Sequence, residues 1–142
     1  MAAASIRPLA VTPLFVRLGE LFVKGRLDEM SRHFAFPCPI EIEGGLVVIR
    51  TPKVLEAFLA TRRSSALLAG MTQMTPRIAA IEMPRKGRFR VWLRWEYIFE
   101  DVCLPDEYGS VYYLAQKPWG ELMIEMVDSV RVPPYAAQAQ SA

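Results

Sequence analysis

The chain has 142 residues, 52% of them hydrophobic, and a formal net charge of +2 at pH 7. This length fits one domain with a hydrophobic core, and the balanced charge gives no indication of a nucleic-acid or membrane partner. Two cysteines without CxxC spacing and a single histidine argue against a disulfide framework or a zinc site, and we expect no cofactor. Because no apolar run is long enough to span a bilayer, we expect a cytoplasmic protein.

The N-terminal part of the chain predicts a helix. Thr12 and Pro13 have the pattern of an N-cap followed by a first helical residue, so we expect residues 1–11 to be a flexible lead. Apolar residues then recur at helical spacing, among them Leu18, until Gly25 ends the pattern. One face of this helix should therefore pack into the core.

Two further helices are expected in the first half of the chain. Residues 27–34 have a shorter helical pattern with apolar residues on one side. Thr51 and Pro52 repeat the cap signal and start a third helix, which we expect to reach Leu67 or Leu68.

Alternation of apolar and polar residues, which is typical of strands with one buried face, marks the other segments. A first hairpin is expected over residues 38–49, with Gly44 and Gly45 at its turn. Residues 105–109 are expected to be a loop. Four strands joined by short turns complete the pattern, over residues 77–83, 88–99, 110–117 and 121–130.

The clearest alternation lies between Arg88 and Phe99. Trp95 and Tyr97 fall on its apolar side, and Trp92 falls among arginines on the other side. We therefore expect one face of this strand to line the interior and the other to meet water or a partner.

Helices precede a run of antiparallel strands, which is the order of an α+β protein rather than an α/β protein. We expect three N-terminal helices packed on a strongly curved antiparallel sheet that leaves a cone-shaped interior. The domain should cover residues 12–130, and residues 131–142 should form a flexible tail.

This order of elements resembles the nuclear transport factor 2-like (NTF2-like) superfamily, whose fold is a cystatin-like cone. The superfamily includes ketosteroid isomerase, scytalone dehydratase and SnoaL-like polyketide cyclases. The local similarity lies in Lys24-Gly25-Arg26-Leu27-Asp28, Met30, His33-Phe34-Ala35, Ile40-Glu41-Ile42 and Trp119-Gly120. The resemblance implies a ligand-binding pocket inside the cone and a homodimer formed by the outer sheet face.

The resemblance also implies where an isomerase would carry its functional groups. The general-base aspartate corresponds to Ile42 and the oxyanion-hole tyrosine corresponds to Leu18. Isoleucine cannot accept a proton and leucine cannot donate a hydrogen bond, so the known isomerase mechanism does not transfer. Whether the chain is an enzyme stays open. If it is one, we expect an isomerase, a cyclase or a dehydratase that works by proton transfer.

Two residues are candidate acid–base groups. If Leu122, Ile124 and Met126 face the interior, a period of two places Asp128 on the same face, where burial would raise its pKa. The competing interpretation is a solvated aspartate at a strand end. His33, at the edge of the second helix, can reach the mouth of the cone as a base or donor, or it can be a packed histidine bonded to a carbonyl oxygen.

Further residues are expected to contact a small hydrophobic molecule. Trp95, Tyr97 and Tyr112 offer apolar rings with polar tips, which suit a ligand pocket and an ordinary core about equally. The remaining expected ligand contacts are Ile42, Leu18 and Met126.

The outer face of the long strand carries Trp92 between Arg90 and Arg94, a composition typical of protein interfaces. Glutamates share this face, so we expect its charges to pair across strands rather than to bind nucleic acid. These three residues are the expected dimer interface. The alternative function is therefore a non-catalytic dimeric interaction module that uses the outer sheet face.

Overall fold

The computed structural model describes residues 8–42, 45–100, 102–106 and 108–131. No helix in these ranges is both long and apolar enough to cross a membrane. In chain order, the elements are α1 (Pro8–Lys24), α2 (Leu27–Ser31), β1 (Cys38–Ile42), β2 (Gly45–Ile49), α3 (Pro52–Leu68), β3 (Met71–Ile81), β4 (Arg88–Phe99), β5 (Val102–Pro105), β6 (Tyr108–Gln116) and β7 (Leu122–Arg131).

The strands form one seven-stranded sheet in the order β2-β1-β7-β6-β4-β3, with β5 paired to the end of β4. Neighbouring strands run antiparallel except β1 and β7, which run parallel and pair at Ile40 and Val127. The expectation of a wholly antiparallel sheet is therefore wrong at this junction. No tight turn links β1 to β7, so their relative direction is set by how the β1–β2 hairpin joins the sheet.

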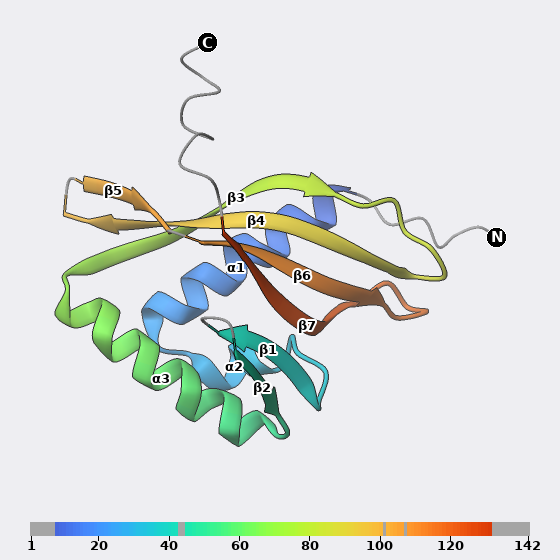
Figure 1. Cartoon of the computed structure of the whole chain (residues 1–142), viewed down its shortest axis with the longest axis horizontal. Coiled ribbons are helices and arrows are strands. Elements are labelled where there is room, and N and C mark those ends of the chain that lie inside the picture. The colour runs from blue at the N-terminus through green and yellow to red at the C-terminus, as the bar shows by residue number, and fades with distance from the viewer. Residues whose placement is uncertain (1–7, 43–44, 101, 107, 132–142) are drawn as a thin grey trace, which may run out of the picture.

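Helix α1 lies across one face of the curved sheet, along β3, while α2 and α3 pack against each other beside the β1–β2 hairpin (Figure 1). The close approach of α1 depends on Gly19. A Cβ atom at this position would lie 2.4 Å from the backbone oxygen of Met74 and 3.3 Å from Cζ3 of Trp95. The absence of a side chain therefore lets the helix contact the sheet. The arrangement is the expected α+β cone.

Helix α1 begins earlier than the sequence predicts. It starts at Pro8, so Pro13 lies inside it and residues 8–11 are helical rather than part of a lead. Pro13 cannot donate a backbone hydrogen bond, which disfavours it inside a helix. Val11 is completely buried in the core, which stabilises this added part of the helix. Residues 1–7, the rest of the expected lead, lie outside the described residues.

Helix α2 ends at Ser31, earlier than the expected end near Phe34. The chain after it bonds to β7 instead. The backbone amide of Ile124 donates a hydrogen bond to the carbonyl oxygen of His33 at 2.8 Å. The backbone amide of Ala35 donates one to the carbonyl oxygen of Ile124, also at 2.8 Å. Phe34 is thereby paired with Ile124. Helical periodicity in the sequence carries no information about such a distant backbone partner.

Helix α3 and strand β4 have the predicted positions. Thr51 caps α3, because its hydroxyl oxygen accepts a hydrogen bond from the amide of Val54 at 3.3 Å. Strand β3 is longer than expected and already begins at Met71.

The expected loop over residues 105–109 is wrong at both ends, because β5 ends at Pro105 and β6 begins at Tyr108. In the first hairpin, Gly45 belongs to β2 and pairs with Ile42, while Gly44 lies outside the described residues. Strand β7 includes Arg131, and the rest of the expected tail is not described.

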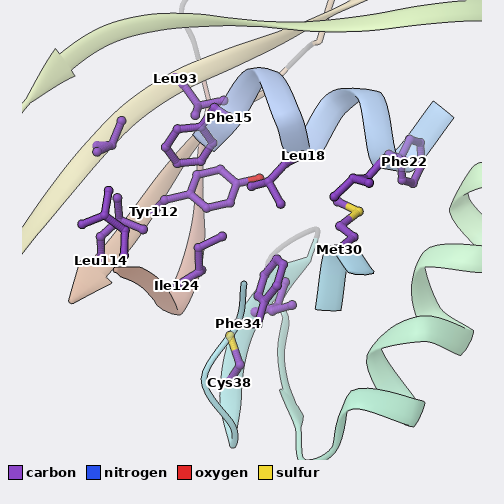
Figure 2. Close-up of a cluster of buried hydrophobic side chains, with 14 of the residues drawn as sticks. Phe15, Leu18, Phe22, Met30, Phe34, Cys38, Leu93, Tyr112, Leu114 and Ile124 are labelled. Atoms are coloured by element: carbon purple, nitrogen blue, oxygen red, sulfur yellow. The ribbon is translucent and has the colours of Figure 1, made fainter. Parts of the chain in front are cut away.

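The inner face of β4 builds the core as its alternation predicts. Trp95 and the inward residues before it on β4 are buried, and the apolar stripe of α1 packs against the same core. Figure 2 shows Phe15 and Leu18 of α1 directed toward the ring of Tyr112 on β6.

Candidate functional site at the mouth of the cone

Aromatic side chains fill the interior of the cone. Phe15 packs edge-on against Trp95 and Tyr112, with ring centroids 6.4 and 4.8 Å apart. Nε1 of Trp95 donates a hydrogen bond to the Tyr112 hydroxyl at 3.1 Å, and burial raises the pKa of Tyr112 to about 12. The sequence predicts Trp95, Tyr112 and Leu18 as ligand contacts. In the structure all three are buried members of the core.

Tyr97 and Asp106 form a polar pair where β4 pairs with β5. The Tyr97 hydroxyl donates a hydrogen bond to Oδ2 of Asp106 at 2.8 Å. Burial, followed by the neighbouring Asp106 carboxylate, raises the pKa of Tyr97 above its ordinary value, so the hydroxyl keeps its proton. The backbone amide of Tyr108 donates a hydrogen bond to Oδ1 of Asp106 at 3.4 Å. The backbone amide of Asp106 itself donates to the carbonyl oxygen of Trp95 at 2.8 Å. These bonds fix the carboxylate beside the tyrosine.

Apolar side chains adjoin this pair and remain open to solvent. Strand β5 pairs with β4 so that Leu104 lies opposite Tyr97 and Val102 lies opposite Phe99, which places all four on one face of the sheet. Leu104 is 50% exposed and Val102 is 53% exposed, although this face turns toward the interior of the cone. We call the five residues Tyr97, Phe99, Val102, Leu104 and Asp106 the mouth patch.

The mouth patch combines apolar area with a few oriented polar groups, which is the usual make-up of a small-molecule site. Its carboxylate has lone pairs beyond those used by Tyr97 and Tyr108. Asp106 can therefore accept a hydrogen bond or a proton from a molecule that lies over the patch.

Asp106 does not appear among the residues that the sequence singles out. In the sequence it is one acidic residue in an expected loop, with no motif around it. The feature that identifies Asp106 is the pairing of strand β5 with β4. Because Phe99 pairs with Val102, the alternation of the two strands brings Leu104 opposite Tyr97 and carries Asp106 to the same face.

Asp128 faces away from the interior, which corrects the sequence-based expectation. Leu114 pairs with Ile124 and Tyr113 pairs with Met126, so Glu125 is an extra residue that forms a bulge. The bulge reverses the alternation of β7, and Asp128 lies opposite Val111 on the outer face.

The Asp128 carboxyl instead belongs to a polar cluster between β7 and β1. A hydrogen bond with Asp128 raises the pKa of Glu41 above its ordinary value. The amide of Ser129 donates to Oε1 of Glu41 at 3.2 Å and to Oδ1 of Asp128 at 2.8 Å.

The bulge also changes the position expected for Met126. It pairs with Tyr113, which in turn pairs with Arg90 of the outer face, so Met126 does not face the interior. Ile42, the other apolar candidate of this set, is half-buried and packs against the core on the inner side. The expectation is therefore corrected for Met126, while Ile42 lies on the expected face.

His33 lies in the turn after α2, apart from the mouth patch. Its backbone oxygen accepts the hydrogen bond from Ile124 that joins this turn to β7. Partial burial lowers the pKa of its side chain, and the charge of Glu121 acts in the opposite direction. The other charged groups acting on it are Arg17 and Glu29, and neither belongs to the mouth patch.

The surface of the described residues has open hollows, among them a larger and a smaller one. The larger, of about 480 Å³, lies between α2 and the start of α3, and Phe34 and Phe36 are among its lining residues. The smaller, of about 260 Å³, lies on the outer sheet face beside Arg88 and Glu125. Neither is lined by a residue of the mouth patch. No group of three His, Cys, Asp or Glu side chains in the described ranges can hold a metal ion.

The sequence matches no protein-family model and no curated protein. Solved structures do match the fold. A Nostoc punctiforme domain of unknown function with a cystatin-like fold gives a TM-score of 0.69 at 12% identity, covering 94% of this chain and 82% of that one. The chain has the cystatin-like fold of the NTF2-like proteins.

Two other structures with this NTF2-like architecture have informative descriptions. A Catenulispora acidiphila protein in complex with S-DNPA gives a TM-score of 0.63 at 9% identity, covering 93% of this chain and 95% of that one. The β subunit of benzoate 1,2-dioxygenase from Burkholderia mallei gives a TM-score of 0.63 at 16% identity, covering 94% of this chain and 95% of that one. At these identities the likeness concerns the fold alone.

The outer face of this NTF2-like sheet has the charge pairing that the sequence predicts. Ion pairs connect Arg88 with Glu125 at 3.0 Å, Arg90 with Glu82 at 2.7 Å and Arg77 with Glu96 at 3.3 Å. Each of these three arginines is paired with a neighbouring carboxylate, so their charges are balanced locally rather than gathered into one basic surface.

The expected interface residues all lie at or near this outer face. Trp92 is half-buried, and the Arg90 guanidinium lies 5.0 Å from the centroid of its ring. Nε of Arg94 donates to the backbone oxygen of Asp106 at 2.6 Å. Arg94 is thus bonded to the same segment that carries the carboxylate of the mouth patch.

Proposed function

We propose that this protein binds a small, largely apolar molecule at the mouth patch. The observation that carries the proposal is the hydrogen-bonded Tyr97–Asp106 pair, 2.8 Å apart, beside the exposed apolar side chains of Val102 and Leu104. Covering those two side chains removes apolar surface from water, which favours binding. A protein with the same fold in complex with S-DNPA supports the use of this architecture for small molecules.

The same proposal includes a chemical role for the polar pair. Asp106 acts as a general base that takes a proton from a C–H or O–H group of the bound molecule, and the electron pair left behind stays in that molecule. Tyr97 holds the carboxylate through its hydroxyl. This is proton transfer of the isomerase, cyclase or dehydratase type, with Asp106 in place of Asp128 or His33.

Binding is tested with the neutral fluorescent probe N-phenyl-1-naphthylamine. Leu104→Lys introduces a charge into the apolar part of the mouth patch, and we expect it to weaken probe binding by about tenfold or more, because burying a leucine side chain contributes about 1.5–3 kcal/mol. The measurement is a fluorescence titration of the folded variants.

Leu46→Lys is the matched control. Leu46 is also exposed and apolar, but it lies on β2, whereas Leu104 lies on β5 beside Tyr97. We expect its probe affinity to equal that of the unchanged protein. Equal affinities for Leu104→Lys and Leu46→Lys, or no binding by the unchanged protein, would contradict the proposed site.

The second candidate function is association of two copies through the outer sheet face. Trp92, Tyr113 and Met126 are half-buried and form an apolar outer patch around the buried Val111, because strand pairing places all four on one face. The ion pairs of Arg88 and Arg90 lie on the same face. An apolar centre with polar surroundings is the usual anatomy of a protein interface.

The outer patch predicts a dimer that depends on Trp92. Trp92→Asp places an unpaired charge in the contact and should convert the dimer into a monomer, as measured by native mass spectrometry. Trp119→Asp makes the same exchange at an exposed turn tryptophan and should leave the dimer intact. A monomeric unchanged protein at micromolar concentration would rule out this interface.

A further inference from the structure

Arg62 occupies an unusual position on helix α3. The buried residues Leu55 and Leu59 mark the inward face of this helix. Arg62 follows them by seven and three residues, so helical periodicity places it in the middle of the same face. Arg62 is nevertheless exposed. The inward face of α3 is therefore open to solvent at this point rather than sealed against the sheet.

The guanidinium of Arg62 is held beside an apolar side chain. Its Cζ atom lies 4.9 Å from the centroid of the Phe58 ring, one helical turn earlier. Phe58 is half-buried and packs against the core. The cation–π contact therefore directs the charged group along the inner side of the helix.

The charge of Arg62 also acts on the tyrosines of the sheet. Burial is the main cause that raises the pKa values of Tyr97 and Tyr112, and the positive charge of Arg62 acts against it at both hydroxyls. This influence agrees with the placement of Arg62 on the inward side of α3, which its spacing from Leu55 and Leu59 and its contact with Phe58 indicate.

No ion pair compensates this cation in the part of the chain that the structure describes. The salt bridges found there involve other arginines and Lys53, and none includes Arg62. The neighbouring Arg63 is used differently, because it donates two hydrogen bonds to the backbone oxygen of Val23 at 3.2 and 3.0 Å. Arg63 thus joins α3 to α1, while Arg62 has no ion pair among the described residues.

We propose that the molecule bound at the mouth patch is an amphipathic organic anion whose negative group pairs with Arg62. The inference rests on the proposed binding function and names the ligand class for that site. The apolar body of the ligand covers Val102 and Leu104, and its anionic group turns toward α3 and away from the Asp106 carboxylate. A guanidinium suits this role because it forms charge-assisted hydrogen bonds with carboxylate or sulfonate oxygens.

Two fluorescent probes that differ in one charged group test the inference. The anion 1-anilinonaphthalene-8-sulfonate carries a sulfonate on the same aromatic framework as the neutral N-phenyl-1-naphthylamine. We expect Arg62→Gln to weaken binding of the anion by roughly three- to tenfold, which is the range of a solvent-accessible charge-assisted contact. Binding of the neutral probe should stay unchanged.

The control variants separate local pairing from net charge. Arg50→Gln removes the same charge from an exposed position before α3 and should leave both affinities unchanged. Arg62→Lys keeps the charge and should retain most of the preference for the anion. Added salt should weaken anion binding in the unchanged protein and have little effect on the neutral probe. Thermal unfolding of each variant verifies that it is folded.

The possible outcomes distinguish the inference from the proposed function. If both probes bind and Arg62→Gln leaves the affinity for the anion unchanged, the anionic ligand class is wrong and the binding site stands. The anionic ligand class is also wrong if Arg62→Gln weakens the binding of both probes equally. If neither probe binds the unchanged protein, the proposed function fails and the inference fails with it.

Discussion

Replacing Phe15 by alanine should lower the free energy of unfolding by about 3–5 kcal/mol. Phe15 is completely buried, and its ring contacts both Tyr112 and Trp95 at the centre of the cone. Alanine would leave a cavity that the neighbouring rings cannot fill without breaking the hydrogen bond between Trp95 and Tyr112. Equilibrium unfolding in urea, followed by tryptophan fluorescence, measures the loss.

Val16→Ala is the control for this prediction, because Val16 is the next residue on α1 and is 41% exposed. Its unfolding free energy should change by less than about 0.5 kcal/mol. A loss below about 1 kcal/mol for Phe15→Ala would contradict a filled core around Phe15, since truncation at a fully packed aromatic site costs more than that.

Gly19→Ala should lower the free energy of unfolding by about 1–3 kcal/mol, the usual cost of adding volume to a packed contact. An alanine Cβ would lie 2.4 Å from the backbone oxygen of Met74, and a backbone atom of β3 cannot move aside as a flexible side chain can. Alanine is otherwise the better helix former by about 1 kcal/mol, so a loss of stability isolates the steric effect. Thermal or urea unfolding measures it.

Gly45→Ala provides the matched comparison. The nearest atom to a Cβ at this position is the backbone oxygen of Ile42 at 3.5 Å, an ordinary van der Waals distance. We expect a change within about 0.5 kcal/mol, as for most substitutions at exposed positions. If Gly19→Ala were as stable as the unchanged protein, α1 could not approach β3 as closely as the 2.4 Å distance at Gly19 indicates.

The local patterns of the sequence predict most of the fold. The alternation of β4 gives its bounds and its buried face, because a side-chain period of two is a property of the extended backbone itself. The Thr51-Pro52 pair predicts the start of α3, because the cap uses groups only three residues apart. Both signals are complete within a short stretch of chain.

Errors arise where an interaction partner is distant in the sequence. Helix α2 ends early because the backbone after it bonds to β7, about ninety residues later. The short strand β5 has too few residues for a recognisable period, and only its pairing with β4 defines it. The bulge at Glu125 is likewise a property of two paired strands, and it alone moves Asp128 and Met126 to the outer face.

The same distinction between local and distant interactions applies to the residues of the candidate site. Tyr97 can be found from the sequence, because it lies on the inner face of a strongly alternating strand. Asp106 and Arg62 cannot, since one follows a strand too short to predict and the other looks like a solvent-exposed helix residue. Strand pairing brings Asp106 beside Tyr97, and the packing of α3 against α2 and β3 sets the position of the helix that carries Arg62.

The amino-acid pattern alone determined the α+β class, the long two-faced strand and the apolar side of each helix, because burial periodicity is encoded in neighbouring residues. Only the tertiary structure decided which polar groups meet. The side on which a carboxylate emerges depends on register, bulges and the docking of separate elements, and a single inserted residue in a strand reverses it.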